Sequence, residues 1–152
     1  MKDVVIVCKG NTCRSPMAVA LLSQMLRRGG HGDRVGLRTA GIWATEGQPA
    51  TADAQKAMQE RGLDISRHRS HLLTADDIRR ADLLVTMEAA IAEALRIEAP
   101  WAIRKIATLG DLADDPRDVD DPVGRGLDEY RRVVELLQGM LQRAYARIVA
   151  PP

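Results

Sequence analysis

A thiol and a guanidinium form the most reactive pair of side chains in this sequence. Cys8 is followed six positions later by Arg14, and Ser15 comes directly after it. Only a thiolate attacks electrophiles, and nearby cations and N–H donors favour that form of a cysteine. Arg14 can hold two phosphate oxygens and keep them while charge redistributes in a transition state. The Ser15 hydroxyl is expected within reach of the Cys8 sulfur, where it would steady a departing thiolate. These residue types predict phosphoryl transfer to cysteine.

The neighbouring residues predict the elements that position this pair. Residues 4–7 are β-branched and apolar, which is typical of a strand buried on both faces. Gly10 and Asn11 readily adopt positive φ, and Ser15 and Pro16 are suited to the N-cap and first turn of a helix. A strand, a tight loop and a helix start point backbone N–H groups into one concavity, which predicts an anion site. The loop residues expected to bind or support phosphate are Lys9, Gly10, Asn11, Thr12 and Cys13.

The bulk composition predicts one domain spanning residues 1–152. The chain is 45% hydrophobic, its net charge is +1, and it has two cysteines. A net charge this small gives no global field that would recruit nucleic acid or an anionic membrane. No apolar run approaches the length of a membrane span, and residues 1–20 lack a signal-peptide pattern. Because both cysteines lie in the reactive-looking loop, we expect a reducing, cytoplasmic location.

Further along, apolar periodicity and turn signals predict alternating helices and strands. Strands are expected at 35–39, 82–87 and 103–109, and helices at 17–28, 51–62, 75–80, 88–97 and 127–148, with loops at 63–73 and 110–126. Thr51 is expected to open one of these helices, and Thr74 is suited to capping another. The alternation predicts an α/β fold of three layers, with a four-stranded parallel sheet and helices on both faces. Ligands of such sheets bind at the carboxyl ends of strands, where the first loop would lie.

The loop at 110–126 is where we expect the general acid. Hydrolysis through a thiolate needs a proton for the leaving group and then a base for water, and one carboxyl group can serve both steps. The loop contains two Asp-Pro pairs, at Asp115 and at Asp121. Asp-Pro is also a common turn dipeptide, so composition alone does not choose between them.

The run Val-Cys-x-Gly-Asn-x-Cys-Arg-Ser-Pro-Met-Ala closely resembles the phosphate-binding loop of the low-molecular-weight protein tyrosine phosphatases. The resemblance extends over nearly the whole chain. It implies hydrolysis of phosphorylated protein side chains through a phosphocysteine intermediate, with inorganic phosphate as product and no cofactor or metal. The spacing to the last helix in that family assigns the acid to Asp121 and leaves Asp115 as a turn residue.

The same resemblance implies roles for residues between the two motifs. Thr39-Ala40-Gly41 is similar to a Ser-Ala-Gly segment of the family, whose hydroxyl braces the loop through Asn11. Trp43 occupies a loop where the family places a residue on the wall of the substrate cleft. His68 is interpreted as a structural histidine. His71 stands where many relatives have arginine, and the sequence suggests no role for it.

Two positions bear on the substrate. Many tyrosine-specific relatives have a bulky aliphatic residue at position 12 and aromatic residues after the Asp-Pro pair, whereas this chain has Thr12 and Val123. A family branch that dephosphorylates protein arginine resembles this chain at both positions. Thr12, Trp43 and Val123 are therefore expected in the cleft. Phosphoarginine is slightly favoured over phosphotyrosine as the substrate group.

Cys13 predicts redox protection, because it could trap an oxidised Cys8 as a disulfide. A thioredoxin-coupled arsenate reductase shares the fold but needs a further cysteine pair, and no cysteine follows Cys13. The loop also lacks the Gly-Lys-Ser/Thr ending of a nucleotide-binding loop, and the two cysteines lack zinc-ligand partners. A phosphopeptide-binding module remains an alternative, although such a module would not use Cys8 or Asp121.

Overall fold

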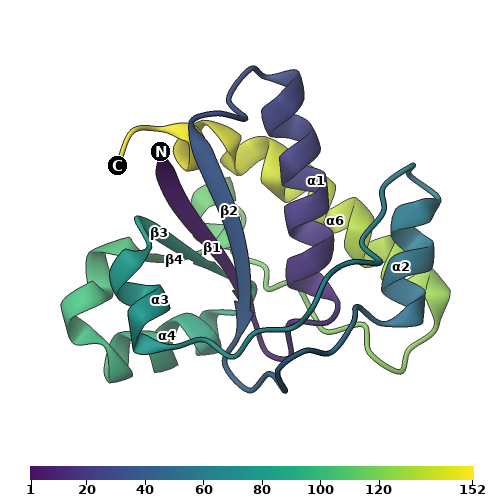
Figure 1. Cartoon of the computed structure of the whole chain (residues 1–152), viewed down its shortest axis with the longest axis horizontal. Helices are drawn as coiled ribbons and strands as arrows, with labels where there is room; N and C mark the ends of the chain where they lie inside the picture. Colours follow the sequence, from purple (N-terminus) through teal and green to yellow (C-terminus); the bar gives the residue numbers. More distant parts are fainter.

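The computed structural model describes residues 1–152 and contains the predicted parallel sheet between two layers of helices (Figure 1). The sheet order is β2-β1-β3-β4, with all neighbours parallel. The strands are β1 (Lys2–Cys8), β2 (Val35–Gly41), β3 (Leu83–Thr86) and β4 (Ile106–Thr108). The helices are α1 (Arg14–Arg28), α2 (Ala52–Gln59), α3 (Ala75–Arg80), α4 (Ala89–Glu98), the 3₁₀ helix η1 (Pro100–Lys105), α5 (Leu109–Ala113) and α6 (Leu127–Val149).

Strand β1 supplies side chains to both helical layers. Val4 and Ile6 belong to one core cluster, which includes apolar residues of α1, α2, α5 and α6. Val5 and Val7 belong to a second cluster with apolar residues of α3 and α4. Successive strand side chains point to opposite faces, so a run of apolar residues is what a strand between two helical layers requires.

The loop after β1 lies where the order of strands in the sheet reverses. From β1 the chain first adds β2 on one side and then crosses to β3 on the other side. The carboxyl ends of β1 and β3 therefore border a crevice in which ligands of open α/β sheets bind. Residues 9–13 connect β1 to α1 at this position.

Several predicted boundaries are wrong. Helix α1 begins at Arg14, so Ser15 is not its N-cap, and the residue before the helix makes no side-chain capping bond. The strand expected at 103–109 is confined to Ile106–Thr108, because Pro100 starts the helix η1 immediately before it. The loop expected at 110–126 contains α5, whose first turn is stabilised by a capping box between Thr108 and Asp111.

The helix start expected at Thr51 and the cap expected at Thr74 are confirmed. Thr51 accepts a hydrogen bond from the Ala54 N–H at the start of α2. Thr74 and Asp77 form a capping box at the start of α3. None of the helices combines the length and the apolar character needed to cross a membrane.

Candidate active site

The loop after β1 exposes several backbone donors at one point. Asn11 has a φ of 59°, which turns the chain back toward Cys8. Its N–H lies 3.3 Å from the Cys8 sulfur. The N–H groups of Gly10, Thr12 and Cys13 have no acceptor within the protein. Together with the N-terminus of α1, these donors suit an anion of several oxygens.

A chain of hydrogen bonds orients the hydroxyl of Ser15. The backbone N–H of His71 donates to Asn11 Oδ1 at 2.8 Å, which fixes the orientation of the Asn11 amide. Asn11 Nδ2 then donates to Ser15 Oγ at 2.7 Å. Ser15 Oγ lies 3.0 Å from Cys8 Sγ, so the Ser15 hydroxyl is free to donate to the sulfur.

The bracing contact expected from Thr39 is absent. The Asn11 side chain pairs with Ser15 and with the backbone of His71, and Thr39 makes no hydrogen bond to it. In addition, His68 Nε2 donates to the Asn11 carbonyl at 2.6 Å. Burial lowers the pKa of His68, which favours the neutral ring in this contact. The loop is thus supported by His68 and His71, which follow Asn11 by 57 and 60 positions. Contacts between residues this far apart leave no local signal in the sequence.

Arg14 is held rigidly beneath the loop. Its side chain is 2% exposed, and its Nη1 pairs with Glu88 and donates to the Val119 carbonyl at 2.8 Å. Nε and Nη2 make no hydrogen bond within the protein, although Nη2 lies 3.8 Å from Asp121 Oδ2. One edge of the guanidinium is therefore anchored, and the other remains available for oxygens in the cleft. Glu88 was not among the predicted site residues.

The two Asp-Pro pairs lie in different environments. Asp121 lines the same cleft as Cys8, and its Oδ1 accepts a hydrogen bond from the Val123 N–H at 3.1 Å. Asp115 instead pairs with Arg117 and Arg143, at 2.7 and 2.9 Å. Hydrogen bonds from the side chain of Arg117 lower the pKa of Asp115 to about 2. Asp115 is also not among the residues that line the cleft of Cys8.

The segment before Asp121 is attached to the end of β3. Val119 N–H donates to the Met87 carbonyl at 2.9 Å. Asp118 Oδ1 accepts a hydrogen bond from the Ala89 N–H at 2.9 Å, at the start of α4. These two contacts hold the segment before Asp121 beside the carboxyl end of β3, which is next to the end of β1 in the sheet.

The cleft has a volume of about 250 Å³. Its wall is formed by the three residues predicted to line it, Thr12, Trp43 and Val123. Trp43 is 70% exposed and lies beneath the ammonium of Lys9, which is 5.0 Å from the ring centroid. The remaining lining residues are Cys8, Lys9, Gly10, Asn11, Cys13, Arg14 and Asp121.

Cys13 faces away from solvent toward α6. Its sulfur lies 3.5 Å from the Tyr130 hydroxyl, and Thr51 Oγ1 donates to that hydroxyl at 3.1 Å. Burial raises the pKa of the Cys13 thiol. Cys8 and Cys13 are both free thiols in this structure.

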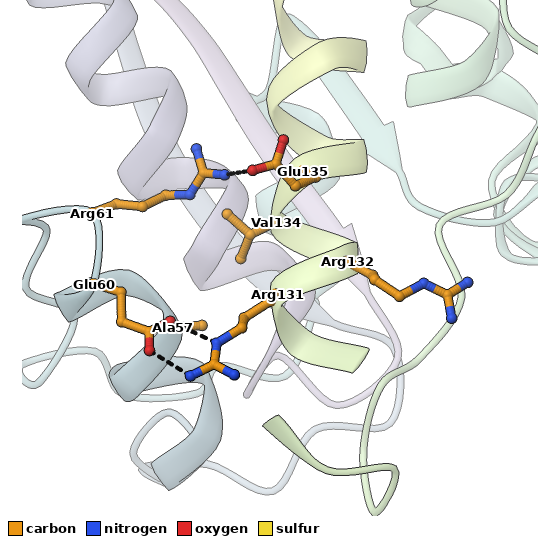
Figure 2. A pocket seen from close by; sticks show the side chains of 7 residues that line it. All are labelled: Ala57, Glu60, Arg61, Arg131, Arg132, Val134 and Glu135. Atoms are coloured by element: carbon orange, nitrogen blue, oxygen red, sulfur yellow. Dashed lines mark hydrogen bonds and ion pairs between the residues drawn. The ribbon is translucent and has the colours of Figure 1, made fainter. Parts of the chain in front are cut away.

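A larger groove, about 450 Å³, lies between α2 and α6. Figure 2 shows two pairs of charged side chains in this groove, Arg131 with Glu60 and Arg61 with Glu135. It contains no nucleophile, so its size does not make it the reaction centre. The structure has no cluster of three or more histidine, cysteine or carboxylate side chains that could hold a metal ion.

Comparisons with known proteins agree with this geometry. The family model for low molecular weight phosphotyrosine protein phosphatase matches residues 3–150. A probable low molecular weight protein-tyrosine-phosphatase, EpsP of Ralstonia nicotianae, is 36% identical over 138 residues, which cover 91% of this chain and 90% of EpsP. The protein-arginine-phosphatase of Bacillus subtilis is 32% identical over 142 residues, or 93% of each chain.

Two further similarities bear on the chemistry. An arsenate reductase of Bacillus cereus is 31% identical over 142 residues, which cover 93% of this chain and 92% of that protein. The solved structure of a cysteine-to-serine mutant of the YwlE arginine phosphatase, with a phosphorylated active-site serine, has a TM-score of 0.91 and 30% identity. That similarity covers 97% of this chain and 96% of the YwlE chain.

Proposed function

The chain belongs to the low-molecular-weight phosphotyrosine protein phosphatase family, and we propose that Cys8, Arg14 and Asp121 carry its reaction. The proposed activity is hydrolysis of phosphorylated protein side chains through a phosphocysteine intermediate. The observation that carries it is the convergence of these three side chains in one cleft, with Arg14 Nη2 3.8 Å from the Asp121 carboxylate.

In the first step, the Cys8 thiolate attacks phosphorus while Asp121 donates a proton to the leaving group. The S–P bond forms, and the bond from phosphorus to the substrate oxygen or nitrogen breaks. The free N–H groups of the loop and the open edge of Arg14 hold the phosphate oxygens through this change. The anchor from Glu88 keeps Arg14 in place, so little reorganisation is needed at the moment of reaction.

In the second step, Asp121 acts as the base for a water molecule. The water oxygen bonds to phosphorus, the S–P bond breaks, and the electron pair returns to the Cys8 sulfur. The oriented hydroxyl of Ser15, 3.0 Å away, stabilises the departing thiolate. Inorganic phosphate is released, and the enzyme returns to its starting state.

For the substrate group, the proposal slightly favours phosphoarginine over phosphotyrosine. In its support, Thr12 lines the cleft with a hydroxyl, and Val123 supplies no aromatic ring after the Asp-Pro pair. The exposed ring of Trp43 on the same cleft is the observation that favours phosphotyrosine, because it could stack on a phenyl group. An arsenate reductase is disfavoured by the cysteine count, since Cys8 and Cys13 are the chain's two cysteines. We place the activity in the cytoplasm, where both thiols would stay reduced.

Hydrolysis assays test this function directly. The wild-type protein is expected to hydrolyse p-nitrophenyl phosphate, and kcat/KM on matched phosphoarginine and phosphotyrosine peptides gives the substrate preference. Cys8→Ser should abolish turnover while phosphate binding and Tm are retained, because the loop donors remain. Arg14→Lys should be severely impaired, since a point charge cannot replace the planar fork. Near wild-type turnover by either variant would contradict the mechanism.

A further inference from the structure

Lys9 is the one residue of the phosphate loop with a cationic side chain at the mouth of the cleft. It follows the nucleophile directly, and its side chain is exposed and lines the cleft. Its ammonium lies over the Trp43 ring at 5.0 Å from the centroid, where the ring's negative face attracts a cation. The ring holds the ammonium at the wall, while the floor of the cleft is formed by Cys8 and Arg14.

The backbone holds the segments that carry Lys9 and Trp43 side by side. Trp43 N–H donates to the Lys9 carbonyl at 3.0 Å, and Ile42 N–H donates to the Cys8 carbonyl at 3.1 Å. The two segments approach so closely that a Cβ at Gly41 would lie 2.7 Å from the Lys9 carbonyl oxygen. Only glycine fits at that point, so the position of Trp43 beside Lys9 depends on the residue at 41.

The Lys9 ammonium is also free of internal partners. Lys2 and Lys105 donate to main-chain carbonyls near them, at 2.9 and 2.8 Å. Lys9 makes no hydrogen bond and no ion pair, and its ammonium has the Trp43 ring as its one recorded contact. An uncompensated cation held on an aromatic ring beside a catalytic cleft is suited to bind a carboxylate of the substrate.

We propose that Lys9 and Trp43 form a subsite that selects protein substrates with an acidic residue next to the phosphorylated one. This inference rests on the proposed phosphatase function and names the class of substrate segment. The phosphate group is held by the loop N–H groups and Arg14, so the subsite acts on the flanking residue. An aspartate or glutamate there would pair with the ammonium while its backbone passes the exposed face of Trp43.

The test combines enzyme variants with paired peptides. The phosphorylated residue in the peptides, arginine or tyrosine, is the one that the wild type hydrolyses faster. Two such phosphopeptides are compared, and they differ only in having Asp or Asn beside the phosphorylated residue. The readout is the ratio of kcat/KM for the Asp peptide to that for the Asn peptide. The wild type should prefer the Asp peptide by about three- to five-fold, the scale of a partly exposed ion pair. Lys9→Met should reduce this ratio to about one, and Lys9→Arg should retain it.

Two controls separate the subsite from general charge effects. Lys56→Met removes an exposed lysine on α2, outside the cleft, and should leave the ratio unchanged. Trp43→Leu should lower the ratio, because the ammonium loses its support. A wild type without preference, or a Lys9→Met variant that loses activity on both peptides in equal proportion, would overturn the inference. A wild type that hydrolyses neither p-nitrophenyl phosphate nor any phosphopeptide would instead refute the proposed function, and the inference with it.

Discussion

The hydroxyl of Ser15 lies 2.7 Å from Asn11 Nδ2 and 3.0 Å from Cys8 Sγ. The sequence predicted two roles for this hydroxyl, as the N-cap of a helix and as a hydrogen-bond donor to the Cys8 thiolate. In the structure it accepts from Asn11 and lies within donating distance of the sulfur, and the helix begins at Arg14 without a side-chain cap. Leaving out a cap costs a helix about 1 kcal/mol, which the surrounding contacts of α1 offset.

The different environments of Asp121 and Asp115 lead to a first prediction. Asp121→Asn should slow hydrolysis of esters with poor leaving groups by about 10²–10⁴-fold and have less effect on activated esters, because it removes the proton donor. Asp115→Asn should leave hydrolysis nearly unchanged and lower Tm, because it weakens the pairing with Arg117 and Arg143. The measurement is kcat across a series of aryl phosphates. The opposite ranking of the two variants would mean that Asp115 is the acid.

Thr12 carries a prediction about substrate choice. Thr12→Ile should reduce activity on phosphoarginine and preserve or raise activity on phosphotyrosine, because an alkyl group beside the phosphorus would desolvate a guanidinium but pack against a phenyl ring. A ten- to thirtyfold change in relative kcat/KM, on the order of one or two kcal/mol, is expected. Equal loss on both substrates would mean that Thr12 only supports the loop.

Cys13 is expected to protect the nucleophile against oxidation. Peroxide should convert the Cys8 thiolate to a sulfenic acid, and attack by Cys13 would release water and form a disulfide. Because burial raises the pKa of Cys13, the disulfide should form faster at higher pH. Mass spectrometry should detect the Cys8–Cys13 linkage, and dithiothreitol should restore activity. In Cys13→Ser, activity lost to peroxide should not return, and recovery equal to that of the wild type would rule out the protective role.

At the scale of elements, an ionic network joins α3 to the sheet and to the phosphate loop. Arg38 on β2 donates to Asp3 on β1 and to Asp77 on α3, at 2.7 and 2.9 Å. Asp77 in turn pairs with the His71 ring at 2.7 Å, and the other ring nitrogen of His71 lies 3.1 Å from Glu46. Because the His71 backbone also binds Asn11, this network connects the edge of the sheet to the site.

The two ring contacts of His71 give a pH-dependent stability. The hydrogen bond to Asp77 raises the pKa of His71. Burial opposes ionisation of Asp77, but hydrogen bonds from Thr74 and His71 lower its pKa to about 2, so it stays charged near neutrality. A raised histidine pKa stabilises the fold fully below about pH 6.5, the unfolded value, and this contribution disappears as pH rises through the folded pKa.

The Tm of His71→Gln should therefore fall below that of the wild type at about pH 5.5 and approach it at higher pH. After discounting for solvent exposure, the contribution is at most about 1 kcal/mol, or roughly 2–4 °C. His68→Gln is the matched control with the opposite sign. Because burial lowers the pKa of His68, the decrease in Tm caused by His68→Gln should be larger at high pH. Parallel Tm curves for wild type and His71→Gln between about pH 5.5 and 8.5 would contradict the assignment.

At the scale of the whole molecule, α6 closes the core and reaches the site. Figure 1 shows it running behind α1, and its buried residues share a cluster with α1, α2 and α5. Near its N-terminus, Tyr130 contacts Cys13. The pairs Arg131–Glu60 and Arg61–Glu135 connect the same part of α6 to the C-terminal end of α2 (Figure 2). Packing of α6 therefore supports the phosphate loop through the contact between Tyr130 and Cys13.

Leu137 on α6 tests how much this packing contributes. It is 0% exposed in the main core cluster, so Leu137→Ala should lower the free energy of unfolding by about 2–5 kcal/mol. Ile97→Ala is the control, because Ile97 is 71% exposed and should change it by under about 0.5 kcal/mol. Urea unfolding measures both. Equal effects would mean that α6 is not an essential part of the core.

The sequence by itself determined the elements whose cause is local. The apolar run at Val4–Val7, the loop at Gly10 and Asn11, and the caps at Thr51 and Thr74 each follow from backbone preferences of a few neighbouring residues. The alternation of strands and helices then determined a parallel three-layer fold. The spacing of Cys8 and Arg14 within one loop predicted that the two side chains meet in one cleft, because both lie at the same strand–helix junction.

The tertiary structure decided what depends on residues far apart in the chain. Arg14 is anchored by Glu88 and Val119, and Asn11 is held by His68 and His71 in place of Thr39, contacts of 57 or more positions that no local pattern encodes. The two Asp-Pro pairs likewise differ in what the fold packs around them, since Asp121 lines the cleft of Cys8 whereas Asp115 pairs with Arg117 and Arg143. A hydrogen bond across the fold depends on where two elements meet, and that is determined by packing of the whole core.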